Sequence, residues 1–248
     1  MGKLHIGTMG WSYDFWMGNF YPQGLKATEF LAEYSKHFDT VEVDSTFYGI
    51  PYKSTVIRWK AQTPTDFLFS LKFPKVITHD KMLKDWEEDA HRFIERISLL
   101  QGKLGPLLLQ FPHGFKPEYL HILNDFLPSL PKGHRFAVEV RNKKLLDDKL
   151  YSLLRENEVA FAIVDHPFMP KLDVTTADFA YIRWEGDRRK VKGTLGKVEV
   201  DRNNDIMAWA ERIKTFLDNS IEVFGYFSKY YSGYPPSDAK QLLQLINH

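Results

Sequence analysis

The chain has 248 residues, of which 44% are hydrophobic, 33 are basic and 32 are acidic. The near-balance of charge gives no global field that would attract nucleic acid or a membrane surface, so any such partner needs a local patch. The absence of cysteine excludes disulfides, thiolate zinc sites and a cysteine nucleophile. The first residues lack the apolar run of a signal peptide, and no stretch approaches the roughly 20 apolar residues of a membrane helix. We therefore expect a cytoplasmic protein with no membrane partner.

Stretches that alternate apolar and polar residues recur along the chain, separated by stretches with helical spacing. Eight stretches predict strands: residues 4–8, 40–45, 67–73, 107–111, 135–141, 160–165, 179–185 and 222–228. Seven predict helices: residues 26–38, 53–62, 82–101, 117–127, 145–157, 203–217 and 237–246.

Strands that alternate with helices pair in parallel, and eight such units close as a (β/α)8 barrel. The alternative is a doubly wound open sheet, whose first strand leads into a Gly-rich phosphate loop. Here the first strand leads into TMGWSYDFW instead. The sequence therefore favours a single α/β domain over residues 1–248, folded as a TIM-type barrel.

The strand at residues 40–45 places Val41 and Val43 on one face and the carboxylates of Glu42 and Asp44 on the other. In a barrel one face of each strand packs against the outer helices and the other points inward. The same alternation in the other strands gives a largely polar inward set: Glu42, Asp44, Ser70, Lys72, Gln110, Glu139, Arg141, Asp165, Arg183, Glu185, Tyr226 and Ser228. Buried charges are costly unless paired. The set therefore predicts either ion pairs that plug the barrel or a charged pocket at the carboxyl ends of the strands, where barrel enzymes place their chemistry.

Six motifs carry a resemblance to a known family: IGTMGWSYDFWMGNFYP, TVEVDSTFYGIP, the Thr78-His79 pair, LGPLLLQFP, VEVR and GYPPSDA. Together they resemble the YecE-like family, catalogued as domain of unknown function 72, from near residue 4 to near residue 246. The resemblance implies a TIM-type barrel, and it implies no activity because the family's role is not established. The family commonly has Phe-Asn-Asn at the end of the last strand. This chain has Phe227-Ser228-Lys229 there, which puts any role of those amides in question.

The predicted pocket supplies groups for proton transfer and for ligand binding. The predicted catalytic residues are Asp44, Lys72, Glu139 and Asp165. The predicted substrate-binding residues are Trp11, Tyr48, His79, Gln110, Arg141, Arg183 and Tyr226, with Trp11 and Tyr48 at the rim. We expect these residues to surround one cavity.

The charges favour an anionic ligand over a metal ion, although the two interpretations are close. The inward set contains three cations and five carboxylates. The numbers of positive and negative charges at the pocket become equal if Glu42 is already paired inside the barrel and Glu185 reaches solvent. The loop at residues 186–193 then adds four basic residues, and barrels frequently bind phosphate near strands seven and eight. The sequence thus predicts an enzyme that acts on a phosphorylated or otherwise anionic ligand, with no metal site.

Two alternatives stay open. Arg188, Arg189, Lys190 and Lys192, together with the aromatic residues near the rim, would suit a nucleic-acid or nucleotide-binding protein without catalysis. The carboxylates with His79 and His166 would suit a metal-dependent hydrolase or isomerase, although Arg141 and Arg183 oppose a cation. The sequence identifies no cofactor and no oligomeric state.

Overall fold

The computed structural model describes residues 2–247, and the chain is an α/β protein of the (β/α)8 barrel class. Its strands are β1 Leu4–Thr8, β2 Thr40–Val43, β3 Leu68–Lys72, β4 Leu104–Phe111, β5 Phe136–Val140, β6 Ala160–Asp165, β7 Phe179–Trp184 and β8 Glu222–Phe227. Neighbours in the sheet follow the order β1-β8-β7-β6-β5-β4-β3-β2. A parallel bridge between Met9 and Glu42 joins the ends of β1 and β2. The eight predicted strands and the predicted fold class are confirmed.

Seven α-helices accompany the strands within residues 2–247. They are α1 Phe30–Tyr34, α2 Lys53–Gln62, α3 Glu87–Ile97, α4 Leu120–Phe126, α5 Asp148–Glu156, α6 Asn203–Asp218 and α7 Pro235–Asn247. None of the helices described in that range is long and apolar enough to cross a membrane.

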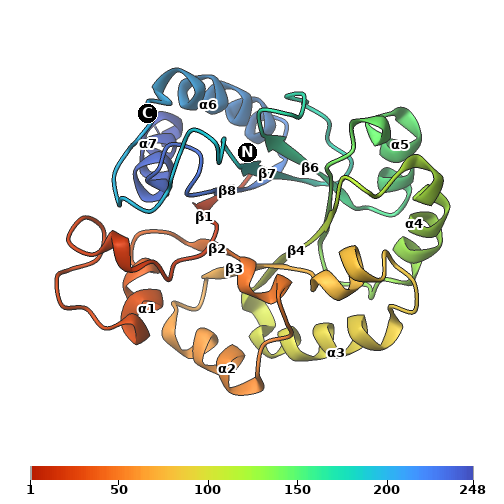
Figure 1. The fold of residues 1–248 in the computed structure, drawn as a ribbon, viewed down its shortest axis with the longest axis horizontal. Helices are drawn as coiled ribbons and strands as arrows, with labels where there is room; N and C mark the ends of the chain where they lie inside the picture. Colours follow the sequence, from red (N-terminus) through yellow and green to blue (C-terminus); the bar gives the residue numbers. More distant parts are fainter. Residues whose placement is uncertain (1, 248) are drawn as a thin grey trace. The chain divides into compact units, whose positions relative to one another are not determined.

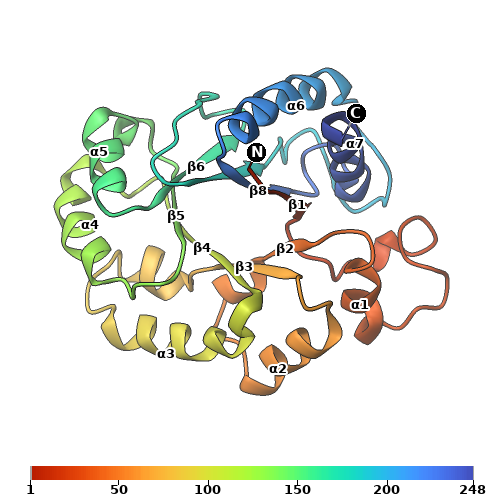
Figure 2. The same ribbon diagram turned by 180° about the vertical axis from the view of Figure 1, so that it is seen from behind.

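The contacts divide the chain into two compact units. The terminal unit comprises Met1–Glu42, Ile163–Leu172 and Phe179–His248, and the central unit comprises Val43–Ala162 and Asp173–Asp178. In the terminal unit, α6 and α7 lie outside β7, β8 and β1 (Figure 1). In the central unit, α2 to α5 lie outside β3, β4 and β5, as the reverse view shows (Figure 2). The single domain predicted from the sequence stays a prediction.

The helix α3 shows how the sequence specifies its own packing. Ala90, Phe93 and Ile97 recur at helical spacing and are buried, while polar or charged residues occupy all the remaining positions except Ile94. Its first turn carries Glu87 and two further acidic residues, and its last turn carries a basic residue. Both charge placements favour the helix dipole.

Four predicted helices are longer than those observed, and two of them differ most. The prediction of a helix over residues 82–101 is wrong at its start, because Met82, Leu83 and Asp85 have φ of 47°, 64° and 43°. These left-handed conformations cannot continue a right-handed helix. The predicted helix at residues 26–38 is reduced to a 3-10 turn followed by the five residues of α1. Apolar spacing alone predicted neither the left-handed residues before α3 nor the 3-10 turn before α1.

The strands are buried on both faces, as expected for a parallel sheet that helices cover. Leu107, Leu108 and Leu109 are consecutive in β4 and all have no exposed surface. Charged side chains share this environment, since Glu42 and Glu139 are fully buried and Arg183 is 1% exposed. Such charges require partners, and those partners define the candidate site.

Candidate functional site

Several segments of the central unit bring polar groups to the carboxyl ends of its strands. The segments are the 3-10 turn Asp44–Phe47 after β2, the end of β3, the π-helical turn Val76–Asp80, and the ends of β4 and β5. They carry the set that we call the central site: Asp44, Phe47, Lys72, Thr78, His79, Gln110, Glu139 and Arg141. Single π-helical turns are rare and often occur at functional sites.

Lys72 is a nearly buried cation at the end of β3, with 8% of its surface exposed. Its Nζ lies 4.3 Å from the centroid of the Phe47 ring and 3.9 Å from Oδ1 of Asp44. A cation over a ring face is attracted by the ring quadrupole, and more strongly when water is excluded. The 3-10 turn after β2 therefore supplies both groups that position this ammonium.

His79 lies beside these residues on the π-helical turn. Its Nδ1 lies 2.8 Å from Oγ1 of Thr78, and its ring meets the Phe47 ring edge-on with centroids 4.8 Å apart. Burial lowers the pKa of His79, and the positive charge of Lys72 lowers it further, while Asp80 and Glu139 oppose this change. His79 is therefore neutral at pH 7 and can accept a proton.

Glu139 lies in β5, and Arg141 is the first residue after that strand. Glu139 is fully buried, and its carboxylate contacts Nε of Arg141, whose side chain is 17% exposed. Gln110 of β4 is the register partner of Glu139 in the parallel pair. Together with Lys72 and Asp44, this pair gives the central site two cations and two carboxylates.

We expect the low pKa of His79 to appear in the pH dependence of stability. In the unfolded chain His79 titrates near 6.5, and in the folded chain it titrates lower. Between these two pKa values the unfolded state binds more protons, so stability rises with pH through this window, and the full contribution is present above about pH 6.5. Urea unfolding at pH 5.5 and 7.5 should show a smaller difference for His79→Gln than for the wild type. The exposed His121→Gln on α4 is the control, and an unchanged difference in His79→Gln would contradict the expectation.

In the terminal unit, Arg183 is held by two carboxylates. Its Nε and Nη2 donate to Glu42 at 3.0 and 2.7 Å, and its Nη1 donates to Glu185 at 2.6 Å. Tyr181 also donates to Glu42, at 2.6 Å, and its pKa is raised well above the usual range by burial and by the Glu42 charge. The internal pair predicted for Glu42 is therefore present. The expectation that Glu185 reaches solvent is wrong, because it is 4% exposed and pairs with Arg183.

The other predicted residues of the terminal unit have separate surroundings. Asp165 accepts from Nε1 of Trp209 at 2.8 Å and lies 3.2 Å from Nζ of Lys171, so its carboxylate is directed to α6. This placement contradicts the inward direction predicted from alternation, because Asp165 is the last residue of β6 and contacts a helix residue.

Tyr226 and Trp11 also belong to the terminal unit, and Tyr48 belongs to the central unit. Tyr226 is fully buried, with its hydroxyl 2.9 Å from Oγ1 of Thr40. The carbonyl of Trp11, a half-buried residue, accepts from the Tyr21 hydroxyl. Tyr48 is 76% exposed and packs edge-on against Phe47. The structure thus brings Asp44, Tyr48, Lys72, His79, Gln110, Glu139 and Arg141 into one unit, and the predicted common cavity with the remaining four stays a prediction.

Two residues of the central site were missed as site residues in the sequence. Phe47 is the ring that both Lys72 and His79 contact. Thr78 was noticed only as part of a motif, although its hydroxyl contacts the His79 ring. Their position directly after β2 and β3 was the available signal, because residues that follow barrel strands line the functional face.

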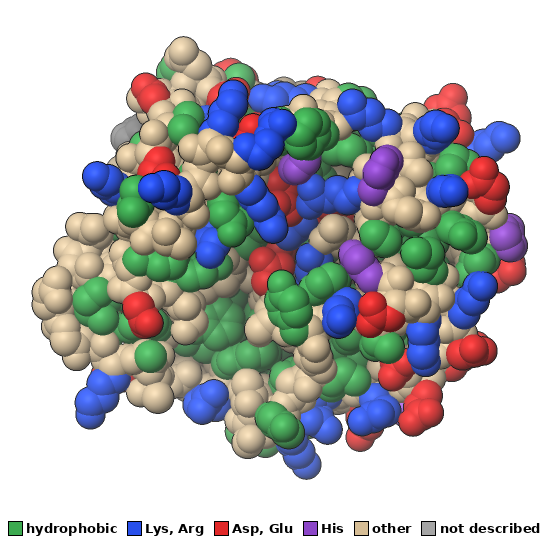
Figure 3. Space-filling view, in the orientation of Figure 1, with side chains coloured by type: hydrophobic (Ala, Val, Ile, Leu, Met, Phe, Trp, Pro, Cys, Tyr) green, Lys and Arg blue, Asp and Glu red, His purple; other side chains and the backbone are tan. Residues whose placement is uncertain are grey.

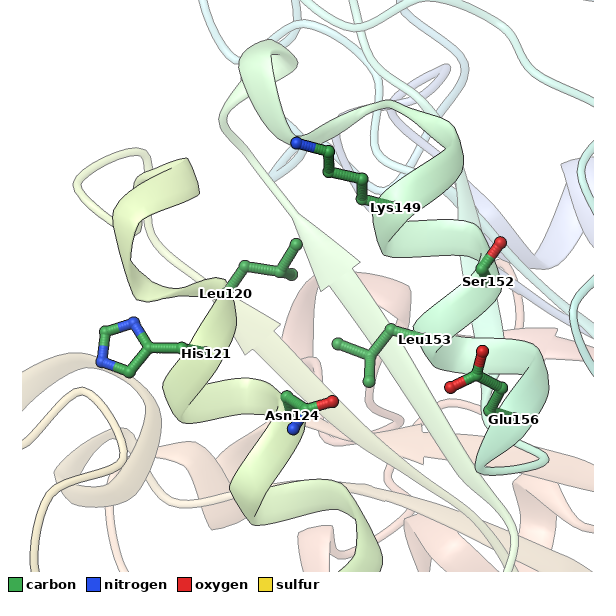
Figure 4. Close-up of a pocket in the computed structure, with 7 residues that line it drawn as sticks. All are labelled: Leu120, His121, Asn124, Lys149, Ser152, Leu153 and Glu156. Carbon is green, nitrogen blue, oxygen red and sulfur yellow. The ribbon is translucent and has the colours of Figure 1, made fainter.

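A groove of about 310 Å³ lies between α4 and α5. It is lined by Leu120, His121, Asn124, Lys149, Ser152, Leu153 and Glu156. The side chains of Leu120 and Leu153 point into it from the two helices (Figure 4). The groove lies in the helix layer and holds none of the predicted site residues. Within residues 2–247, no group of three or more His, Asp or Glu side chains has an arrangement that could hold a metal ion.

A family model described as "Protein of unknown function DUF72" matches residues 5–248. The UPF0759 protein YecE of Escherichia coli strain K12 is 37% identical over 139 residues, which are 56% of this chain and 48% of YecE. The matched part thus spans about half the length of that curated relative. The UPF0759 protein YunF of Bacillus subtilis strain 168 is 24% identical over 98% of this chain and 95% of its own length.

Solved structures give the same family and the same fold. A DUF72 family protein from Thermotoga maritima is 28% identical, with a TM-score of 0.83 over 99% of this chain and 100% of its own. A D-psicose 3-epimerase is 13% identical, with a TM-score of 0.52 over 96% of this chain and 89% of its own. At that identity the likeness concerns the fold alone.

Proposed function

The chain belongs to the DUF72 family, and we propose that it is an enzyme acting on a phosphorylated or otherwise anionic small molecule at the central site. The observation that carries the proposal is that Lys72 and His79, from two separate segments, both contact the Phe47 ring. The charges of Lys72 and Glu139 both act on the pKa of His79. Convergence of titratable groups at strand ends is the usual mark of a barrel active site.

Lys72 and Arg141 are the proposed binding groups for the anion. A nearly buried ammonium attracts an anion more strongly than an exposed one, because less water screens the charge. The Arg141 guanidinium adds a planar donor set that fits a phosphate or carboxylate. Asp44 and the Phe47 ring hold Lys72 in place from the turn after β2.

Glu139 and His79 are the proposed proton carriers. Glu139 is an acceptor next to Arg141, and neutral His79 is an acceptor next to Lys72, so both stand beside a proposed anion-binding cation. A group placed this way transfers protons to or from a ligand that the cation anchors. Gln110, the register partner of Glu139, would donate or accept a hydrogen bond from the ligand. Roles for Trp11, Asp165, Arg183 and Tyr226 at the same ligand stay predictions, as does the cytoplasmic location.

Binding measurements test the proposed anion site. We expect Lys72→Met and Arg141→Met each to weaken binding of sugar phosphates, titrated by calorimetry, by about 10- to 100-fold, since charged hydrogen bonds contribute about 1.5–3 kcal/mol. Lys149→Met removes an exposed lysine from α5 of the same unit and is the matched control. Equal affinities in all four proteins would contradict the proposal.

Turnover tests the proposed proton carrier. Glu139→Gln keeps the shape of the side chain and should leave phosphate affinity within about threefold, while it lowers turnover about 10²- to 10⁴-fold. The measurement is mass spectrometry of a metabolite mixture incubated with each protein. If a chelator abolishes wild-type turnover and a divalent cation restores it, the metal-dependent alternative replaces this proposal.

A further inference from the structure

Cations and aromatic rings alternate along the strand-end loops of the terminal unit. The loop after β7, residues 186–193, carries four basic residues and one acidic residue. Arg189 of this loop contacts Phe168 in the loop after β6, and Arg188 contacts Tyr230 in the loop after β8. Lys229, also in the loop after β8, contacts Tyr13 in the loop after β1. We call this set the cation–ring surface: Tyr13, Phe168, Arg188, Arg189, Lys229 and Tyr230.

The contacts within the cation–ring surface are close. The guanidinium carbon of Arg189 lies 4.4 Å from the Phe168 ring centroid, and that of Arg188 lies 4.7 Å from the Tyr230 centroid. Nζ of Lys229 lies 5.2 Å from Tyr230 and 5.5 Å from Tyr13. Each ring therefore has a cation beside it, and Tyr230 has two, Arg188 and Lys229.

Half of this surface is open to solvent, while Tyr13, Lys229 and Tyr230 are half-buried. The side chains of Arg188 and Arg189 are 70% and 62% exposed, and Phe168 is 53% exposed, which is unusual for a phenylalanine. Lys and Arg side chains next to hydrophobic ones are visible over the segment between β7 and α6 (Figure 3). Planar guanidinium groups and ring edges are thus available for stacking with a planar ligand group.

The basic loop is held in one conformation by its own hydrogen bonds. Asp187 accepts from the backbone N–H of Arg189 at 3.0 Å and from its Nε at 2.9 Å, and these bonds lower the pKa of Asp187. Gly186 has a φ of 69°, and a Cβ there would lie 2.0 Å from the Tyr230 carbonyl oxygen. Glu199 accepts from the N–H groups of Lys192 and Gly193 at 2.9 and 2.7 Å. A loop ordered before binding loses less entropy when a ligand arrives.

We propose that the cation–ring surface binds single-stranded nucleic acid. Aromatic rings and guanidinium planes stack on unpaired bases of any sequence, and lysines contact the phosphates between them. A duplex offers its phosphates but keeps its bases stacked, so the rings favour single strands. The chain's net charge of +1 supplies no general attraction, which makes this local patch the source of binding. The inference does not depend on the proposed enzyme at the central site.

Fluorescence anisotropy with a labelled 12-nucleotide oligouridylate tests the inference. If the three cations of the surface each neutralise one phosphate, the logarithm of the binding constant should fall against the logarithm of salt with a slope of about −2. The double variant Arg188→Gln, Arg189→Gln should reduce that slope to about −0.7. Phe168→Ser should weaken binding about tenfold with the slope unchanged, because it removes stacking and no charge.

The control is Lys214→Gln, which removes a basic residue from α6 in the same unit and should bind as the wild type does. Several outcomes would overturn the inference. They are no binding of the oligonucleotide, an equal loss in the control, and equal affinity for heparin or for a duplex of the same length, which would reveal a general polyanion contact.

Discussion

Replacing Arg183 by methionine should destabilise the protein by about 3–5 kcal/mol, which is the cost of leaving buried charge without its partner. Arg183 is 1% exposed and neutralises Glu42, which is fully buried, and Glu185, which is 4% exposed. Methionine is similar in length but donates no hydrogen bond. Both carboxylates would then face a site that water does not reach. Urea unfolding followed by circular dichroism measures the change.

A second substitution separates lost charge from lost packing. In the double variant Glu42→Gln, Arg183→Met, one buried negative charge is removed, so part of the lost stability should return. The exposed Arg58→Met on α2 is the control and should change stability by less than about 0.5 kcal/mol. A loss of less than about 1 kcal/mol in Arg183→Met would contradict the view that the three groups form a buried ion-pair network.

Replacing Asp238 by asparagine should stabilise the protein at pH 8 by about 2–4 kcal/mol. Asp238 is 3% exposed, in the first turn of α7, and accepts from the Ser232 hydroxyl at 2.6 Å. Burial raises its pKa to about 7, against smaller opposing effects of Ser232 and Arg202. Asparagine keeps an oxygen for the Ser232 hydroxyl and carries no charge to bury.

The sign of this pH dependence follows from proton binding. Between about pH 4 and pH 7 the folded state keeps the Asp238 proton and the unfolded state releases it, so stability falls as pH rises. Above about pH 7 the loss is complete. Thermal unfolding at pH 4.5 and pH 8 should therefore show the two proteins converging at the lower pH. A constant difference between them at both values would contradict the raised pKa.

Local sequence pattern was sufficient to predict the strands, most of the helices and the fold class. Alternation and helical spacing are local properties, and β6 covers the residues 160–165 that alternation predicted. The regular exchange of strands and helices then implied parallel pairing and a barrel. Local pattern failed where the backbone departs from both regular conformations, as in the left-handed residues before α3.

The sequence also placed Lys72, Gln110 and Glu139 correctly at the ends of their strands. Because alternation locates the end of each strand in the sequence, the residues near that end can be predicted without the structure.

The pairing of the charged groups could not be predicted from sequence pattern, because it depends on long-range packing. Glu42 and Arg183 are 141 residues apart in the sequence, and their pairing depends on the packing of side chains from β2 and β7. The same holds for Asp165, which contacts Trp209 of α6 although alternation had assigned it to the barrel interior. A long polar side chain has several possible partners within reach. Burial and hydrogen-bond geometry select among them, and neither can be read from the periodicity of the sequence.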